Sequence, residues 1–258
     1  MYRIFLNLSI GLFFISVLFS CINDNDDVKV SYGVIRNINS MNNYEILTDK
    51  GNTLKVLKSH ATQTIENEKR VLVNYEILSD KDKDKHIFDV QVNGFYQLLS
   101  KPVIFESFIQ QDEENRRDSI GNDPFNQIDC GFGGNYININ FEITYSLYSD
   151  KKHLINLVYD DLHTDGDTIY FTLLHNAYGE IPGNNISLQK GIGRSSFKIS
   201  DLLPSGITSK VVKITWYEYG LNNESRERTI SGIFKINDTS LNNRLAQHIG
   251  FDSSIRVK

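Results

Sequence analysis

The sequence has little cysteine, proline, alanine or excess positive charge, and each shortage excludes something. Two cysteines in 258 residues, Cys21 and Cys130, are too few for the disulfide framework of a small secreted domain. Alanine, the strongest helix former, is nearly absent, and proline occurs only four times. By contrast, 13 tyrosines and 15 phenylalanines favour strands. The composition therefore indicates a sheet-rich globular protein.

The charge balance argues against nucleic acid as a partner. The formal net charge is −5, and residues 1–20 contain Arg3 and no acidic residue, so their removal changes the charge from −5 to −6. Affinity for nucleic acid depends on lysine and arginine neutralising phosphates, which an acidic chain cannot do well. Its length suits one large or two small domains, and we expect two.

The N-terminus reads as a lipoprotein signal peptide over residues 1–20. Arg3 precedes an apolar run that ends in Leu18-Phe19-Ser20-Cys21 and is shorter than the roughly 20 residues needed to span a bilayer. The junction is similar to a bacterial lipobox, in which Cys21 becomes the acylated first residue, although Phe19 is bulkier than usual there. An ordinary cleaved signal and an uncleaved anchor are the alternatives. Residues 21–27, which contain three aspartates, form an acidic tether.

Residues 28–104 predict a small barrel of the OB type. Strands are expected at 29–35 and 70–78, a hairpin at 44–56 around Asp49-Lys50-Gly51-Asn52, and a further strand through Phe88, Val90 and Val92. The charge run at 79–85 cannot bury itself. About five strands in some 70 residues suggest a closed or nearly closed barrel. The segment 97–104 reads as the exit from this barrel, because Pro102 cannot donate to a strand ladder.

Residues 105–127 read as a polar, irregular connection, and residues 128–258 as a β-sandwich. Apolar residues alternate with polar ones from Ile137 to Tyr145, and five or six more short apolar strands follow. The fold class expected is all-β, with an N-terminal OB-type barrel and a C-terminal β-sandwich after the signal peptide.

The stretch DSIGNDPFNQIDCGFGGNYININFEI, residues 118–143, combines glycines, aspartates and a cysteine. A phosphate-binding loop needs a helix N-terminus after its glycines, but Gly131, Gly133 and Gly134 precede a strand. Glycines in this position more often mark a bulge or a tight turn. We therefore interpret the stretch as an entry into the sandwich, with Cys130 as a packed thiol rather than a nucleophile.

No catalytic, cofactor-binding or metal-binding residue is predicted elsewhere. The segment Asp161–Gly166 resembles the start of a calcium loop, but Thr172 stands where a bidentate glutamate is needed. The six histidines show no metal-binding spacing, and His175 is expected to be hydrogen-bonded near the edge of a core. Gly193–Phe197 lacks the last glycine of a nucleophile elbow. A zinc site assembled from distant residues and an unrecognised enzyme remain as alternatives.

Taken together, several motifs resemble the NigD-like lipoproteins of Bacteroidetes. They are the lipobox, RVLVNY at 70–75, VQVN at 90–93, LSKPV at 99–103, DSIGNDP at 118–124, GGNYININF at 133–141 and Leu174-His175-Asn176. Glu180 departs from the family pattern, which has aspartate there. The resemblance implies an OB-type barrel followed by a β-sandwich, and it supplies no catalytic residues.

We therefore expect a cell-envelope lipoprotein, palmitoylated at Cys21 and anchored in the outer membrane, with the periplasmic and the surface side both open. The acidic residues after Cys21 loosely resemble the export signal of Bacteroidetes surface lipoproteins. The expected role is a non-catalytic binding module for a protein, peptide or glycan, without a cofactor. The alternatives are a bacteriocin-immunity or toxin-neutralising lipoprotein, which the family name suggests, and a hydrolase with its site at the domain interface.

Overall fold

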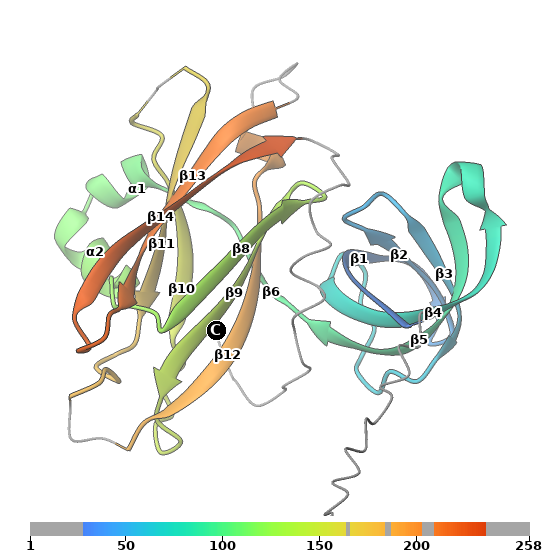
Figure 1. Cartoon of the computed structure of the whole chain (residues 1–258), viewed down its shortest axis with the longest axis horizontal. Helices are drawn as coiled ribbons and strands as arrows, with labels where there is room; N and C mark the ends of the chain where they lie inside the picture. Colours follow the sequence, from blue (N-terminus) through green and yellow to red (C-terminus); the bar gives the residue numbers. More distant parts are fainter. Residues whose placement is uncertain (1–27, 164–165, 184–186, 203–208, 236–258) are drawn as a thin grey trace, which may run out of the picture.

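A computed structural model describes residues 28–163, 166–183, 187–202 and 209–235 and shows a β-barrel followed by a β-sandwich (Figure 1). The predicted fold class, all-β with a barrel before a sandwich, is confirmed. The signal peptide, Cys21 and the acidic tether lie outside the described residues. Among the described residues, no helix is long and apolar enough to cross a bilayer.

Five strands close the barrel in the order β1-β2-β3-β5-β4. β1 pairs with both β2 and β4, and β3 runs parallel to β5, which is the arrangement of an OB fold. The expected hairpin forms, with Gly51 donating its backbone N–H to the carbonyl of Thr48. The strands are β1 (Val28–Ser40), β2 (Asn43–Thr48), β3 (Thr53–Ser59), β4 (Arg70–Asp82) and β5 (Ile87–Gln97).

The charge run at 79–85, which was expected to stay in water, also forms regular secondary structure. β4 continues to Asp82 and is followed by the short 3₁₀-helix η1 (Lys83–Lys85), so the run extends a hairpin with β5. The side chains of residues 79–81 are exposed. Backbone pairing with β5 thus keeps the segment extended while its charges stay in water.

Two sheets form the sandwich, a five-stranded one in the order β14-β13-β11-β10-β7 and a four-stranded one in the order β6-β12-β9-β8. Their inner faces share one apolar core that includes Phe141, Phe171, Phe197 and Ile214. The strands are β6 (Leu99–Lys101), β7 (Ile104–Phe105), β8 (Gln127–Gly133), β9 (Tyr136–Tyr145), β10 (Leu154–Tyr159), β11 (Thr168–Asn176), β12 (Gln189–Lys198), β13 (Ser209–Tyr219) and β14 (Ser225–Lys235); the 3₁₀-helix η2 (Ser200–Leu202) follows β12.

The segment that leaves the barrel also contributes to both sandwich sheets. β6 pairs with β12 and β7 pairs with β10, each in parallel, at one edge of its sheet. Pro102 and Val103 lie between these two short strands, where no ladder hydrogen bond is required of Pro102. The chain therefore enters the sandwich as an edge strand of each sheet.

The connection contains two helices that the sequence did not predict, α1 (Glu106–Gln110) and α2 (Glu113–Ile120). They lie beside the five-stranded sheet (Figure 1). Ile109 and Ile120 pack with Val158 of β10 and Leu174 of β11. The helices therefore cover part of the outer face of this sheet, and the remainder carries exposed side chains.

Candidate functional site

The 118–143 stretch runs from the end of α2 into β9, and its β8–β9 turn lies against the barrel. Gly134 and Asn135 form the turn between β8 and β9 with φ values of 53° and 76°, a left-handed conformation that glycine and asparagine adopt readily. A Cβ on Gly134 would lie 2.5 Å from Oδ1 of Asp49. Cys130 is partly buried against the sandwich core, and burial, followed by the charge of Asp129, raises the pKa of its thiol. A thiolate is disfavoured there.

Behind that turn lies a buried group of polar side chains, here called the interdomain cluster: Asp49 and Arg70 of the barrel with Tyr136, Asn138 and Ser196 of the sandwich. The guanidinium of Arg70 makes a bidentate ion pair with Asp49, at 2.6 and 2.8 Å. It also donates to Ser196 Oγ at 3.0 Å and to Asn138 Oδ1 at 2.9 Å. Its Cζ lies 3.9 Å from the ring centroid of Tyr136.

The interdomain cluster is closed by bonds among its other members. Asn138 Nδ2 donates to Asp49 Oδ2 at 2.9 Å, and the Ser196 hydroxyl donates to Asn138 Oδ1 at 2.8 Å. Nearby, the hydroxyl of Tyr32 donates to Asn140 Oδ1 at 3.1 Å. Because buried charges require both pairing and hydrogen bonds, this arrangement favours the relative orientation of the two domains in which all of these bonds are made.

A cleft of about 610 Å³ opens next to this cluster, between the domains. Its rim carries ion pairs between Arg36 and Glu68 (3.7 Å) and between Lys198 and Asp201 (2.8 Å). The hydrolase alternative requires ionisable groups that converge on a substrate. Here the charged side chains at the rim form ion pairs with one another instead.

The second buried polar group lies at one end of the sandwich and is here called the histidine cluster: Ser146, His153, His175 and Glu180. His153 directly precedes β10 and His175 lies in β11, which pairs with β10. His153 Nδ1 is 2.9 Å from His175 Nε2, and His153 Nε2 is 3.2 Å from Glu180 Oε2. The same Glu180 oxygen accepts the backbone N–H of Ser146 at 2.6 Å.

Burial controls the protonation of this cluster. Burial, and then the neighbouring His153, lowers the pKa of His175 from 6.5 to about 3, against the opposing effect of the backbone at Pro124 and Asp123. Burial would raise the pKa of Glu180, but hydrogen bonds from Ser149, Ser146 and His153 outweigh it and hold that pKa below its ordinary value. Near neutral pH, His175 is therefore neutral and Glu180 is a carboxylate.

The charge of Glu180 determines which ring nitrogen of His153 donates a hydrogen bond to it. A carboxylate only accepts hydrogen bonds, so Nε2 of His153 carries the proton between them. Nδ1 of His153 then either donates to or accepts from His175 Nε2. In both cases the two ring nitrogens of His153 are engaged.

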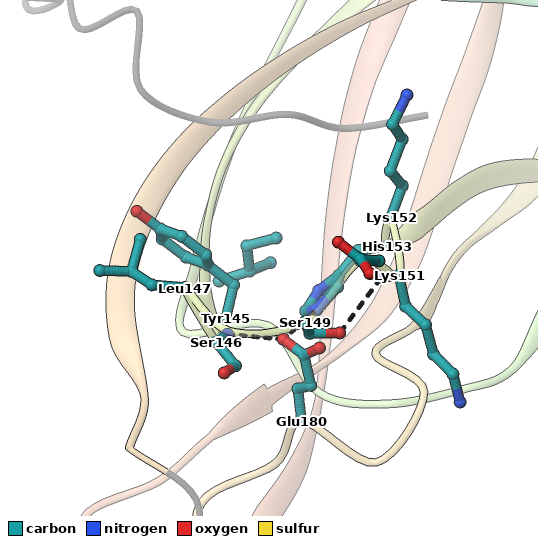
Figure 2. A pocket seen from close by; sticks show the side chains of 10 residues that line it. Tyr145, Ser146, Leu147, Ser149, Lys151, Lys152, His153 and Glu180 are labelled. Carbon is teal, nitrogen blue, oxygen red and sulfur yellow. Dashed lines mark hydrogen bonds and ion pairs between the residues drawn. The ribbon is translucent and has the colours of Figure 1, made fainter.

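A cleft of about 330 Å³ lies against the histidine cluster (Figure 2). The loop of residues 146–153 forms most of its wall, and Ile143, Tyr145 and Glu180 complete it. Figure 2 shows Lys151 and Lys152 extending away from Glu180 in different directions. The bonds of Glu180 to Ser146 and His153 hold this loop at both ends, so the wall of the cleft is preorganised.

His175, Cys130 and Asp161, the first residue of the segment that resembles a calcium loop, have structural roles. His175 is 2% exposed and stacks on Phe125 with ring centroids 4.9 Å apart, as expected of a core histidine. Asp160 accepts the backbone N–H of His163, and Asp161 accepts that of Ser107. In the part of the chain that the structure describes, no three histidine, cysteine or acidic side chains are grouped so as to hold a metal ion.

The sequence alone predicts little of either cluster. Its patterns indicate a turn residue at Asp49 and the start of a strand at Arg70, and they assign no role to His153. Glu180 was noted only as a departure from the family pattern. A charged residue directly before an apolar strand, as in Arg70-Val71-Leu72-Val73, is a weak signal that could have drawn attention to Arg70.

The NigD-like C-terminal beta sandwich domain model matches residues 107–231. Residues 107–231 are therefore a NigD-like C-terminal β-sandwich domain. This match confirms the resemblance to NigD-like proteins that the sequence motifs indicated. No match was found among curated proteins.

Solved structures from Bacteroides and Parabacteroides species share the fold. A toxin-related protein from Parabacteroides distasonis is 23% identical, with a TM-score of 0.59, and the match covers 83% of this chain and 96% of the other. For a NigD-like immunity protein from Bacteroides caccae the values are 19%, 0.58, 78% and 91%. For a protein from Bacteroides fragilis described as a lipoprotein they are 12%, 0.57, 81% and 98%. At these identities the likeness concerns the fold alone.

Proposed function

We propose that this NigD-like chain is a cell-envelope lipoprotein, anchored in the outer membrane through Cys21, that acts as a non-catalytic binding module. The observation that carries the non-catalytic part is the geometry of His153, whose two ring nitrogens are hydrogen-bonded to His175 and Glu180. A general base must present one nitrogen to the group that it deprotonates. His153 therefore holds the loop of the cleft instead of attacking a ligand.

The rigidity of the scaffold supports a binding role. The interdomain cluster holds barrel and sandwich in one orientation, and the histidine cluster holds the cleft wall. Preformed surfaces bind at a lower entropic cost than surfaces that must be ordered on binding. The proposed partner is a protein, a peptide or a glycan, because the acidic chain disfavours nucleic acid.

Turnover assays test the non-catalytic role. Purified protein is incubated with chromogenic esters, phosphate esters and glycosides, beside a His153→Ala variant. We expect no turnover above that of the variant. Hydrolysis that is lost in His153→Ala while the variant remains folded would show that the site is catalytic.

The anchor is supported by the sequence around Cys21 and by the Bacteroides fragilis neighbour described as a lipoprotein. Acyl chains contribute about 0.8 kcal/mol per buried CH₂, and several chains make the attachment stable. Metabolic labelling with palmitate should depend on Cys21, so the Cys21→Ser variant should remain unlabelled. Recovery of the wild-type protein in the soluble periplasmic fraction would contradict the anchor, and protease treatment of intact cells distinguishes the surface from the periplasmic side.

A second candidate function is neutralisation of a toxin at the envelope. It is favoured by the structural neighbours described as a NigD-like immunity protein and as toxin-related. If this function is correct, deletion of the gene should sensitise the cell to a toxin encoded beside it, and the wild-type gene should restore resistance. Unchanged sensitivity after deletion would exclude this function.

A further inference from the structure

A third cleft, of about 600 Å³, lies between α2 and the outer face of the five-stranded sheet. One wall is apolar and consists of Ile109, Ile120 and Leu174. The opposite side is the uncovered part of β11, β13 and β14, which is rich in hydroxyl and aromatic groups. The cleft is thus distinct from the one next to the histidine cluster.

Strand pairing places three threonines in one row across this sheet. Thr172 of β11 lies beside Thr215 of β13, and Thr215 lies opposite Thr229 of β14. The hydroxyls of Thr215 and Thr229 are 3.0 Å apart. Partners in register point to the same face of a sheet, and the flanking Phe171 and Ile214 are buried in the core on the other face. The three hydroxyls therefore face outward.

Tyrosines flank the threonine row on both sides. Tyr217, two residues beyond Thr215 on the same face, lines the cleft, and its hydroxyl donates to Glu227 at 3.4 Å. On the other side, Tyr170 lies beside Lys213, whose Nζ is 5.4 Å from the ring centroid. Partly exposed rings next to hydroxyl groups offer an apolar face and hydrogen bonds together.

The helix wall of the cleft is held in place. The side-chain amide of Asn176 donates to the carbonyls of Asp118 and Ser119, at 3.2 and 3.0 Å, and so fixes the end of α2 to β11. Gly121 has a φ of 74°, and a Cβ there would lie 2.7 Å from Asn176. A ligand would therefore find a largely preformed cleft, as is usual for small-molecule sites.

The charges at the cleft do not favour an ionic ligand. Arg117 is paired with Glu106 and with Glu113, the latter at 3.1 Å. The carboxylates of Asp118, Asp123 and Glu227 disfavour anions. Asp123 already accepts the N–H of Ala177 at 2.7 Å, and Glu227 accepts the Tyr217 hydroxyl, so these two carboxylates do not converge on a single cation.

We propose that this cleft binds a neutral oligosaccharide, with one sugar ring lying against Tyr217 and its hydroxyls bonded to Thr172 and Thr215 of the threonine row. A sugar presents an apolar C–H face and many groups that both donate and accept, which match the apolar wall, the ring and the hydroxyls. The inference rests on the binding role proposed above, but not on the lipid anchor or on toxin neutralisation.

Titration with neutral trisaccharides tests the proposal. The full-length protein, in a detergent without a sugar headgroup, is titrated calorimetrically with maltotriose, cellotriose, mannotriose, xylotriose and chitotriose at millimolar concentration. We expect binding by at least one of them. Tyr217→Ala should weaken that binding about tenfold or more, because it removes the stacking surface. Thr215→Val, which keeps the shape and removes one hydroxyl, should weaken it about threefold to tenfold.

Tyr148→Ala is the matched control, because Tyr148 is 88% exposed and lies on the loop of residues 146–153, beside the histidine cluster. It should leave the affinity unchanged. The proposal is overturned if none of the trisaccharides binds the folded protein, or if binding persists in folded Tyr217→Ala and Thr215→Val. It is also overturned if spermidine, and not the sugars, binds in a way that depends on Tyr217. Each of these results would leave palmitate labelling and toxin sensitivity to be judged separately.

Discussion

The interdomain cluster and the histidine cluster are both buried and polar, but they are built differently. The first joins residues up to 126 positions apart and opposes one guanidinium to one carboxylate, with amide and hydroxyl groups around them. The second joins elements of a single domain and consists mainly of imidazole and carboxylate groups, side-chain types whose ordinary pKa values lie between about 4 and 7. The first should therefore determine how the domains are held together, and the second how the protein responds to acid.

The largest effect is expected from the central charge of the interdomain cluster. Arg70→Met removes the guanidinium that neutralises the buried Asp49 carboxylate, and breaking a buried ion pair in this way typically costs about 3–5 kcal/mol of unfolding free energy. Trp216 is the only tryptophan and lies in the sandwich, so its fluorescence reports that domain, whereas circular dichroism reports both domains. In denaturant the two probes should give one transition for the wild type and separate transitions for the variant.

A matched control and a rescue complete this test. Arg36→Met removes an arginine of the same barrel whose side chain is 46% exposed, and it should cost less than about 1 kcal/mol. Adding Asp49→Asn to Arg70→Met should restore part of the stability, because the unpaired charge is removed. An Arg70→Met variant as stable as Arg36→Met would mean that the buried pair does not hold the domains together.

The next largest loss of stability is expected at the edge of the interdomain cluster, where Gly134 lies close to Asp49. Gly134→Ala introduces a Cβ that would lie 2.8 Å from Cα of Asp49, at a φ of 53°. The left-handed backbone costs about 1–2 kcal/mol for alanine, and overpacking adds about 1–3 kcal/mol. Gly166 has a similar φ of 47° with nothing within 4 Å of its Cβ position, so Gly166→Ala reports the backbone cost alone. Equal losses of unfolding free energy in the two variants would show that the turn does not press on the barrel.

The sequence predicted the architecture because each domain repeats a simple local pattern. Every second residue of β9 from Ile137 to Ile143 is apolar and lies in the sandwich core, and the Asp49–Asn52 turn joins β2 to β3. Strands as short as β6 and β7 have too few residues to show a period. Helix α2 buries only Ile120, so it has no apolar face to recognise.

The clusters could not be predicted, because their members come together only after the chain has folded. Arg70 meets Asp49 from a different hairpin, and it meets Asn138 and Ser196 from a different domain. Each of these residues alone has an ordinary surface interpretation. His175 was correctly expected near the core, whereas its pairing with His153 depends on the register of β10 and β11.

Acid should act on the histidine cluster. In the unfolded chain His175 binds a proton below pH 6.5, but in the folded protein it does so only near pH 3. The stability that comes from keeping His175 neutral is therefore complete above pH 6.5. It is lost as the pH falls toward 3. At pH 5 the expected loss is about 2 kcal/mol. Unfolding free energies measured between pH 8 and pH 5 should fall less for His175→Gln than for the wild type.

His163→Gln is the control for that measurement, because the His163 side chain is 76% exposed. Its stability should depend on pH as that of the wild type does. Below the ordinary pKa of a glutamate, Glu180 adds to the loss, since its lowered pKa contributes stability only while it is ionised. A His175→Gln variant with an unchanged pH profile would assign the acid response to other groups.

The smallest change in unfolding free energy is expected at the rim of the interdomain cleft. It tests whether an ion pair stabilises the protein wherever it lies, or only when it is buried as in the interdomain cluster. Lys198 and Asp201 are 2.8 Å apart, close to the 2.6 Å between Arg70 and Asp49, but their side chains are 49% and 69% exposed. The hydrogen bond from Lys198 lowers the pKa of Asp201, yet water and salt screen an exposed pair. Lys198→Met should therefore change the unfolding free energy by less than about 1 kcal/mol, and by less still in high salt. If Lys198→Met cost as much as Arg70→Met, burial would not be what makes the interdomain pair strong.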